Sequence, residues 1–316
     1  MAILVTGAAG LVGRAAVAAL LRQGVEHVRA VVRDPGQAGD LRRLGAKVAL
    51  LDATDPDGLT AAMDGVFTAC SLTGSLWSRP GEDPHTSVVE PARVFLTAAG
   101  AAGVRRVLVC SPAALTTPAA RDNLHLAAKA EVERMVADSG LEHAILRCTH
   151  VVGPGSRLLA LVTGVAPAER DPALVPGDGR QRVAPIWVGD VADAIALADD
   201  APELPGATWS LSGPTQLTLD DLVDAVNGGR VAKRHLAPEN GEARGRWVGT
   251  SGRAEPRART ASGPWAGLGR VQIEVLAADS LGDPALPSPP GLVPTPLAEA
   301  LAASAGPDRS RVAGPP

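Results

Sequence analysis

The sequence predicts an α/β fold built on a doubly wound, mostly parallel β-sheet, followed by a smaller C-terminal part. In the first half of the chain, short runs rich in β-branched residues alternate with helical stretches, which is the pattern of βαβ units. The first run passes directly into a glycine-rich turn, Thr6–Gly13. Apolar residues make up 46% of the 316 residues and charged residues 20%, so the chain can form a large core.

Six strands are expected in the sheet, with helices between them. Right-handed crossovers place these helices on both faces and bring the carboxyl ends of the strands to one rim, where such sheets bind ligands. The predicted strands are Ala2–Thr6, Val28–Val32, Lys47–Leu51, Val66–Ser71, Val107–Ser111 and His143–Arg147.

The pattern becomes looser after Val151, where prolines interrupt the chain. The elements expected there are a strand Ile186–Val188, a helix Val191–Asp199 with Asp190 as its N-cap, a strand Trp209–Leu211, a helix beginning near Thr218, a strand Val271–Leu276 and a short helix Leu297–Ala303.

These elements predict a first domain over residues 1–150 and a substrate-binding part over 151–281, with 186–200 returning to the first domain. Residues 282–316 are expected to form a mostly irregular tail that adds little to the first domain, with the last dozen residues disordered. Five arginines lie between Arg244 and Arg259. This basic segment is interpreted as solvated and flexible, with an acidic partner as the alternative.

The charge and the chain start exclude several classes of function. A net charge of −4 offers no basic surface for nucleic acid or an anionic membrane. Met1 is followed almost at once by the glycine turn, which leaves no room for an export signal, and no apolar run reaches the length of a membrane span. A cytoplasmic protein with a small-molecule partner is therefore expected, while its oligomeric state stays open.

The three cysteines, Cys70, Cys110 and Cys148, lie far apart in the sequence. Their spacing indicates neither a disulfide framework nor a zinc site. We expect all three to be buried thiols, and no metal is predicted.

The glycine turn has the spacing of a Rossmann dinucleotide-binding site, because it follows a strand and opens a helix. Gly7 permits the tight turn, Gly10 lets the backbone approach a pyrophosphate, and Gly13 lets the helix pack closely on the sheet. An ordinary turn is the alternative. The coenzyme contacts expected here are Thr6, Gly7, Ala9, Gly10, Leu11, Val12 and Gly13.

The end of the second strand predicts the coenzyme. Arg33 stands where NAD-preferring proteins usually carry an acidic residue, which favours the 2′-phosphate of NADPH over NADH. Asp34 could still reach a ribose hydroxyl, and Arg33 could simply be solvated. Asp52, after the third strand, is placed either to meet the adenine edge or to cap a turn.

Together with these features, several short runs carry a family resemblance. The runs are Arg33-Asp34-Pro35, Leu51–Asp55, Arg106–Ser111, Leu146-Arg147, Val188–Ala192 and Leu211–Pro214. The chain resembles an atypical short-chain dehydrogenase/reductase, and within that superfamily it is most similar to the NmrA-like and related NAD(P)H-binding members. The resemblance covers Met1 to Arg234 and does not extend past Pro238.

The resemblance implies a Rossmann domain that holds NAD(P)H and a C-terminal part that covers the nicotinamide. Where family members carry a Tyr-x-x-x-Lys pair, this chain has His125 and Lys129, and it contains no tyrosine. Ser111 matches a substrate-orienting serine. The further coenzyme contacts expected are Asp52, Ala53, Ala69, Cys70, Ser71, Lys129 and the carboxamide-binding stretch Thr149, His150 and Val151.

Carbonyl reduction needs a hydride donor, a group that polarises the carbonyl, and a proton. His125 and Lys129 are four positions apart and share a helix face. With a reference pKa of about 6.5, His125 would be partly protonated near neutrality and could deliver the proton. Alternatively His125 only packs beside the coenzyme, or His150 supplies the proton. Lys129 would hold the ribose, and Ser111 would bond to the carbonyl oxygen.

The favoured hypothesis is an NADPH-dependent ketoreductase for a ketone or quinone of a bulky, possibly aromatic, secondary metabolite such as a polyketide, as in antibiotic biosynthesis. It resembles tailoring ketoreductases that lack the family tyrosine. The alternative is a non-catalytic, NADP-sensing regulator of the NmrA-like kind. A sugar-nucleotide epimerase is disfavoured, because that chemistry depends even more on the tyrosine.

Overall fold

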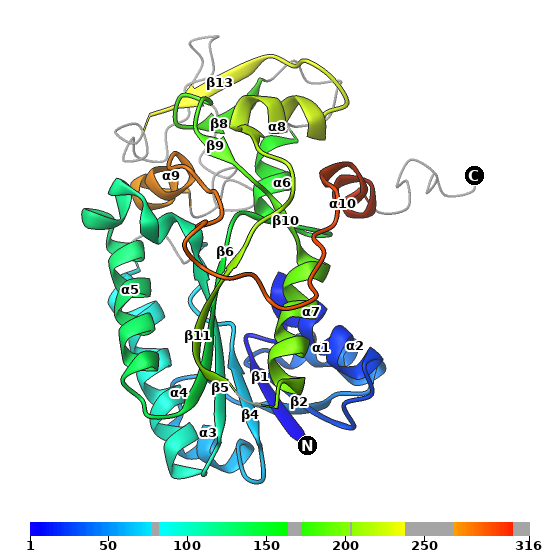
Figure 1. The fold of residues 1–316 in the computed structure, drawn as a ribbon, viewed down its shortest axis with the longest axis vertical. Coiled ribbons are helices and arrows are strands. Elements are labelled where there is room, and N and C mark those ends of the chain that lie inside the picture. Colours follow the sequence, from blue (N-terminus) through cyan, green and yellow to red (C-terminus); the bar gives the residue numbers. More distant parts are fainter. Residues whose placement is uncertain (78–81, 164–171, 203, 238–267, 306–316) are drawn as a thin grey trace.

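The computed structural model describes residues 1–77, 82–163, 172–202, 204–237 and 268–305. Its centre is a seven-stranded sheet in the order β11-β6-β5-β4-β1-β2-β3, in which all neighbouring strands run parallel (Figure 1). The strands are β1 (Ala2–Thr6), β2 (His27–Val32), β3 (Lys47–Leu50), β4 (Thr68–Ser71), β5 (Arg106–Pro112), β6 (Glu142–Cys148) and β11 (Pro205–Leu211). The doubly wound Rossmann-type sheet is therefore confirmed, and each of the six predicted strands is present within two residues of its expected ends.

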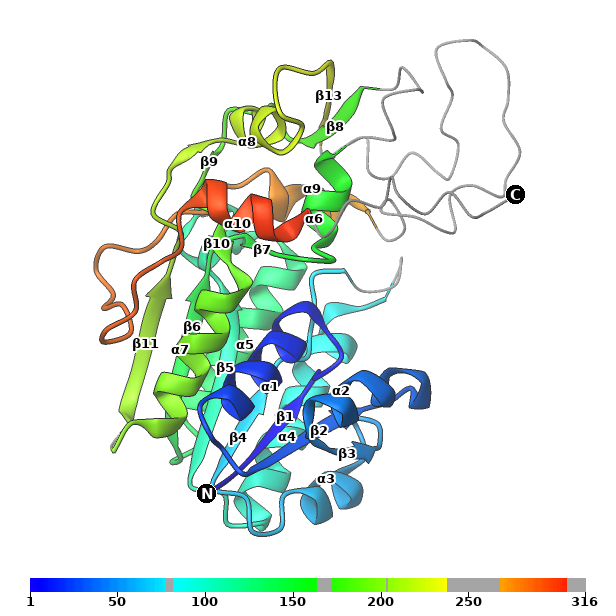
Figure 2. The same ribbon diagram turned by 90° about the vertical axis from the view of Figure 1, so that its right-hand side faces the viewer.

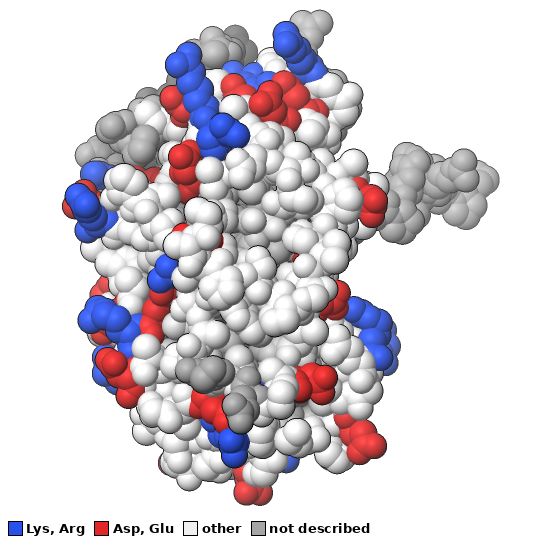
Figure 3. Space-filling model, viewed as in Figure 1, with Lys and Arg blue, Asp and Glu red and all other residues white. Residues whose placement is uncertain are grey.

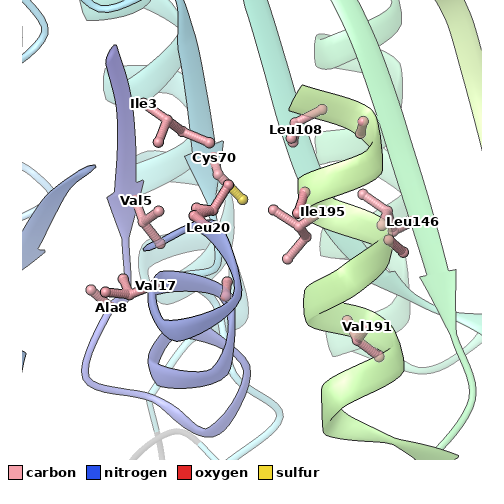
Figure 4. Packing of buried hydrophobic residues seen from close by; sticks show 14 of the residues in the cluster. Ile3, Val5, Ala8, Val17, Leu20, Cys70, Leu108, Leu146, Val191 and Ile195 are labelled. Carbon is pink, nitrogen blue, oxygen red and sulfur yellow. The ribbon is translucent and has the colours of Figure 1, made fainter. Parts of the chain in front are cut away.

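Alternating side chains divide the core into two layers, one on each face of the sheet. Ile3 and Val5 of β1 point into one layer, and Leu4 between them points into the other. The first layer is covered by α1 (Leu11–Arg22), α2 (Ala38–Leu44) and α7 (Val188–Asp200). The second is covered by α3 (Pro56–Ala62), α4 (Glu90–Ala101) and α5 (Leu124–Ala137). Figure 2 shows α1 and α7 on the same face of the sheet, and Figure 4 shows the side chains of these two helices meeting those of the strands.

A smaller lobe lies over the carboxyl ends of the strands (Figure 1). It consists of short helices and of paired strands that are two or four residues long. These elements surround an apolar cluster of their own. The pairs are β10 (Ile186–Trp187) with β7 (Val151–Val152), β12 (Leu217–Thr218) with β9 (Arg182–Val183), and β13 (Lys233–Leu236) with β8 (Ala173–Pro176). The helices are α6 (Arg157–Val162), α8 (Leu219–Val226), α9 (Arg270–Leu276) and α10 (Leu297–Ser304).

The prediction of a strand at Val271–Leu276 is wrong, because this segment forms α9. Its apolar residues alternate, but the buried residues are Gln272, Ile273, Val275 and Leu276, whose spacing fits one face of a helix. The side-chain oxygen of Gln272 also accepts a hydrogen bond from the backbone N–H of Gly269 (3.0 Å), which stabilises the first turn. The secondary structure of this segment therefore follows the helical spacing of its buried residues and not the alternation of its apolar residues.

The prediction that Asp190 caps a helix is also wrong, because α7 begins earlier, at Val188, with Trp187 in the N-cap position. Asp190 lies in the first turn and is buried. It accepts hydrogen bonds from the backbone N–H and the hydroxyl of Thr295, at 2.8 and 2.6 Å. Burial raises the pKa of the Asp190 carboxyl, and the two bonds from Thr295 counteract that effect.

Residues 281–296, which we call the strap, have no regular structure but run along β11 and α7 (Figure 1). The backbone N–H of Asp283 donates to the Ser210 hydroxyl (2.8 Å), and the N–H of Ser210 donates to the carbonyl of Pro287 (2.9 Å). Leu292 packs against the core beside α1 and α7. The strap therefore contributes more to the Rossmann part than the sequence led us to expect. Residues 306–316 and the arginines of 244–259 lie outside the described residues.

The surface over this region carries few charges. In Figure 3 the charged side chains lie mainly around the periphery of the face, and the strap itself has Asp283 as its one charged residue. In the described part of the chain, no helix is both long enough and apolar enough to cross a membrane.

The contact between the strap and Asp190 predicts a stability change. Thr295→Val removes the hydroxyl donor and leaves the buried carboxylate with one bond, so the free energy of unfolding should fall by about 1 to 3 kcal/mol. Urea denaturation measures the change. The control is Thr215→Val, at an exposed threonine with no side-chain hydrogen bond among those the structure gives. If both variants unfold at the same urea concentration, Asp190 does not anchor the strap.

Candidate active site

The glycine turn leaves no room for larger residues at two of its positions. Gly7 has a φ of +66°, and a Cβ atom there would lie 2.6 Å from the carbonyl oxygen of Leu72, which follows β4. A Cβ atom on Gly13 would collide with the carbonyl oxygen of Gly7. Gly10 closes the turn by donating its N–H to that same oxygen (3.0 Å). The turn therefore lies where the strand order reverses, between β1 and β4, as a dinucleotide site requires.

The turn also presents the N-terminus of α1. Gly10 precedes the helix in an extended conformation, and no side chain caps it. The first N–H groups of α1, at Leu11, Val12 and Gly13, are therefore available to an anion such as a pyrophosphate. Thr6 lies below the turn, and its buried hydroxyl donates weakly to the carbonyl of Cys70 (3.5 Å).

Arg14 was missed by the sequence analysis, although it directly follows Gly13. Its guanidinium donates to the carbonyl of Ala9 in the turn (3.0 Å) and lies 3.5 Å from Asp40 of α2. An arginine one residue after the last glycine of the motif was the available signal. Arg14 links the turn to the helix that follows β2.

Arg33, at the end of β2, is largely exposed and 3.9 Å from the carboxylate of Asp52. Asp34 is already used, because it accepts a hydrogen bond from the N–H of Gly36 (2.8 Å). Asp52 accepts bonds from the hydroxyl and the N–H of Thr54, at 2.8 and 3.0 Å. These bonds, with a smaller contribution from Arg33, lower the pKa of Asp52. Asp52 therefore makes a turn beside Ala53, the alternative considered for it, and Arg33 is the largely exposed cation of the ion pair.

The predicted contacts at the end of β4 lie at different depths. Ala69 and Cys70 are fully buried, in opposite core layers, so their side chains do not reach the rim. Ser71 is at the rim, with its hydroxyl 3.1 Å from that of Thr73. Burial raises the pKa of the Cys70 thiol well above its usual range.

Cys148 is buried as expected, whereas Cys110 is only partly buried. Both cysteines lie on adjacent strands, β6 and β5, and their side chains are close enough to hydrogen bond. That bond and burial raise the pKa of the Cys148 thiol well above its usual range.

Ser111, near the end of β5, has a buried hydroxyl that finds no hydrogen-bond partner among the described residues. A buried hydroxyl without a partner costs free energy in the protein alone. It is therefore a donor available to a ligand at the rim.

Lys129 and His125 lie on the same face of α5, and both are buried. The ammonium group of Lys129 donates to the carbonyl of Thr73, in the loop after β4 (3.2 Å). Burial lowers the pKa of Lys129, while the nearby thiol of Cys110 and the carboxylate of Glu133 counteract that effect. Helix α5 packs against β5, the strand that carries Cys110 and Ser111.

The expectation that His125 is partly protonated near neutrality is wrong. Burial, and secondarily the positive charge of Lys129, lower the pKa of His125 to about 3. The imidazole is therefore neutral at pH 7. It can donate one hydrogen bond and accept another, but it does not carry the second ring proton that an acid would deliver.

A buried ion pair fixes the position of α5 against the sheet. Arg147 of β6 bonds to both carboxylate oxygens of Glu133, at 2.6 to 3.2 Å. The bonds to Glu133 raise the pKa of Arg147. Glu133 is one helical turn beyond Lys129, so the pair holds the face of α5 that carries Lys129.

The predicted carboxamide stretch is tied into the protein. The N–H of Thr149 donates to the carbonyl of Leu211 (2.9 Å), and the N–H of His150 donates to the hydroxyl of Ser280 (3.1 Å). Val151 begins β7 and pairs with β10. Nε2 of His150 is buried without a partner among the described residues, and burial lowers the pKa of this imidazole to about 4. This ring nitrogen is the open polar group of the stretch.

Comparison with known proteins shows which family model and which reductases this chain is similar to. A family model described as NAD(P)H-binding matches residues 7–196. Quinone oxidoreductase 2 of Escherichia coli (strain K12) is 26% identical over 222 residues, covering 70% of this chain and 71% of that protein. The 3-diazoavenalumate denitrifying reductase of Streptomyces sp is 30% identical over 183 residues, covering 49% of this chain and 58% of that protein.

Solved structures show the same fold over almost the whole length. Citrobacter sp. triphenylmethane reductase complexed with NADP(H) matches with a TM-score of 0.71 at 17% identity, covering 96% of this chain and 100% of that chain. The Escherichia coli quinone oxidoreductase QOR2 complexed with NADPH matches with a TM-score of 0.69 at 23% identity, covering 95% and 98%. The small lobe is thus part of a shared architecture.

The low pKa of His125 predicts a pH dependence of stability. Above pH 6.5 the imidazole is neutral in both the folded and the unfolded chain. As the pH falls below about 6.5, the unfolded chain binds a proton that the folded protein accepts only near pH 3, so stability falls by up to about 1.4 kcal/mol per pH unit. Urea denaturation between pH 7 and 5 should show a shallower loss for His125→Gln than for the original protein. Equal slopes would show that His125 is not buried as a neutral group.

Proposed function

Because this chain belongs to the NAD(P)H-binding family, we propose that it is an NADPH-dependent reductase that transfers hydride to a carbonyl of a quinone or ketone. One observation carries the proposal. The buried ammonium of Lys129 and the unpartnered hydroxyl of Ser111 lie on two elements that pack together, α5 and β5, and Lys129 also bonds to the loop after β4, beside the dinucleotide turn. A positive charge and a free donor are the groups that stabilise an oxygen as it becomes negative.

The residues present fit a dinucleotide. The turn Gly7–Gly13 would hold the pyrophosphate at the uncapped N-terminus of α1, and Lys129 would hold the nicotinamide ribose. When bound, NADPH supplies the hydride. Arg33 supports NADPH over NADH, since Asp34, which could have met a ribose hydroxyl, already caps a turn.

The absence of tyrosine favours a quinone over a simple ketone. Hydride addition to a ketone produces a strongly basic alkoxide, which needs a proton from the enzyme. Hydride addition to a quinone produces a phenolate-like oxygen, whose conjugate acid has a pKa of about 10, as tyrosine does. Water can supply that proton. Ser111 and Lys129 then need only to stabilise the charge, and His125, which is neutral, need only orient the acceptor or a water molecule.

The class of acceptor remains part of the proposal. An aromatic, polycyclic quinone fits the predicted role in the tailoring of a polyketide or another secondary metabolite. The quinone oxidoreductase QOR2 and triphenylmethane reductase, which share this fold, are named for a quinone and for triphenylmethane. A ketone of such a metabolite is the next candidate, and there the neutral His125 would have to pass on a proton from water.

A second function, NADP sensing without turnover, is favoured by one specific observation. Neither of the two imidazoles at the rim, His125 and His150, is protonated near pH 7, and the chain has no phenol. Such a site could hold the coenzyme without reducing anything. Turnover of an acceptor with NADPH distinguishes the reductase from the sensor.

The first experiment measures NADPH consumption with 1,4-naphthoquinone, a polycyclic quinone and an aromatic ketone. The proposal expects quinone turnover that Ser111→Ala lowers by about ten- to a thousandfold, the effect of losing one oxyanion donor, with NADPH affinity unchanged. Ser139→Ala, just beyond the C-terminal end of α5, is the control. NADPH binding without turnover of any acceptor would instead support the sensor.

The second experiment tests the coenzyme. A charge-assisted bond from Arg33 to the 2′-phosphate contributes about 1.5 to 3 kcal/mol, so NADPH should bind about ten- to a hundredfold more tightly than NADH. Arg33→Ala should remove this preference by weakening NADPH alone. Arg22→Ala, at the far end of α1, is the control. Equal affinities of the original protein for the two coenzymes would overturn the assignment.

A further inference from the structure

Helix α9 contacts two segments that border the candidate active site, the loop after β4 and the start of α5. Its Gln272 donates to the carbonyl of Leu76 (3.2 Å), in the same loop whose Thr73 carbonyl accepts from Lys129. Its Val275 packs in a small cluster with Leu126 of α5. α9 follows the point where the family resemblance ends, and so the resemblance predicts nothing about it.

Asn123, the N-cap of α5, connects this helix to α9. Its side-chain oxygen accepts from the N–H groups of His125 and Leu126, at 3.0 and 3.1 Å. Its side-chain nitrogen donates to the carbonyl of Val271 (3.0 Å) and to the carboxylate of Glu274 (2.9 Å), both in α9. Asn123 is 2% exposed, and every hydrogen of its amide is used.

The choice of asparagine is informative. An N-cap needs only an oxygen acceptor, and aspartate or serine would serve α5 equally well. The two N–H donors of asparagine are needed only by α9. An aspartate would instead place a second carboxylate beside that of Glu274, which also accepts from Arg270 (2.7 Å).

We propose that Asn123 and Glu274 are positioning residues for the reductase reaction: they set the first turn of α5, and with it His125 and Lys129, only when α9 is docked. The proposal rests on the proposed function and deepens it. The contact from Gln272 to Leu76 acts on the same site, because it holds the loop that provides the acceptor for Lys129. α9 thus couples the small lobe to the candidate active site at two points, the loop after β4 and the N-cap of α5.

The test is Asn123→Asp, which keeps the cap of α5 but removes both donors to α9. We expect quinone turnover to fall by about tenfold, with NADPH affinity changed much less. In the double variant Asn123→Asp with Glu274→Gln, the new amide of residue 274 can donate to the new carboxylate of residue 123. That variant should regain most of the lost turnover. Thr218→Ala, which removes the N-cap of α8 away from α5, should lower the melting temperature without changing turnover.

A second readout does not depend on activity. Histidine-labelled protein gives a ring signal of His125 in NMR spectra, assigned by its loss in His125→Gln. This signal should shift in Asn123→Asp and return in the double variant. If Asn123→Asp does not fold, Glu274→Ala leaves the cap intact and should give the same shift.

The outcomes distinguish the positioning role of Asn123 and Glu274 from the proposed reductase function. An unshifted His125 signal in Asn123→Asp and in Glu274→Ala would overturn the positioning role, whatever the activity. A shifted and rescued signal in a protein without any turnover would retain the positioning role and overturn the proposed reductase function.

Discussion

The close approach of the backbone at Gly7 to the chain leaving β4 is the constraint on which the candidate site depends. The sheet order reverses at this point, so it is the one place where α1 and the loop after β4 face the same space. Because a side chain at Gly7 or Gly13 would separate these segments, the turn brings the uncapped N-terminus of α1 next to the loop that contains Thr73. The bond from Lys129 to Thr73 then ties α5 to the same place.

Burial determines what the groups at the rim can do. A buried lysine keeps its charge only with difficulty, and here a carbonyl, a carboxylate one turn away and thiols surround it. The same burial leaves His125 and His150 neutral, so the site offers the positive charge of Lys129 and hydrogen bonds but no protonated imidazole. For this reason the proposed acceptor is a quinone, whose reduced form is a weaker base than the alkoxide from a ketone.

The sequence was sufficient for the fold and for the conformation of the glycine turn, because both depend on local sequence patterns. The strand and helix periodicities and the glycine spacing each depend on residues only a few positions apart in the sequence. The structure contains the elements that they predict. The errors concern contacts between distant segments. Asp190 was expected to cap its own helix but binds Thr295, 105 residues away. The alternation of Val271–Leu276 hid a helix that docks on Asn123, and the pKa of His125 depends on burial that no local pattern reveals.

Hydrogen exchange measured by mass spectrometry, with and without NADPH, tests the central claim that the rim between β1, β4 and α5 is the coenzyme site. The account predicts slower exchange in peptides that cover Gly7–Gly13 and Leu72–Gly74, with no change in α8 of the small lobe. Protection confined to the small lobe, or none in the glycine turn at saturating NADPH, would contradict it.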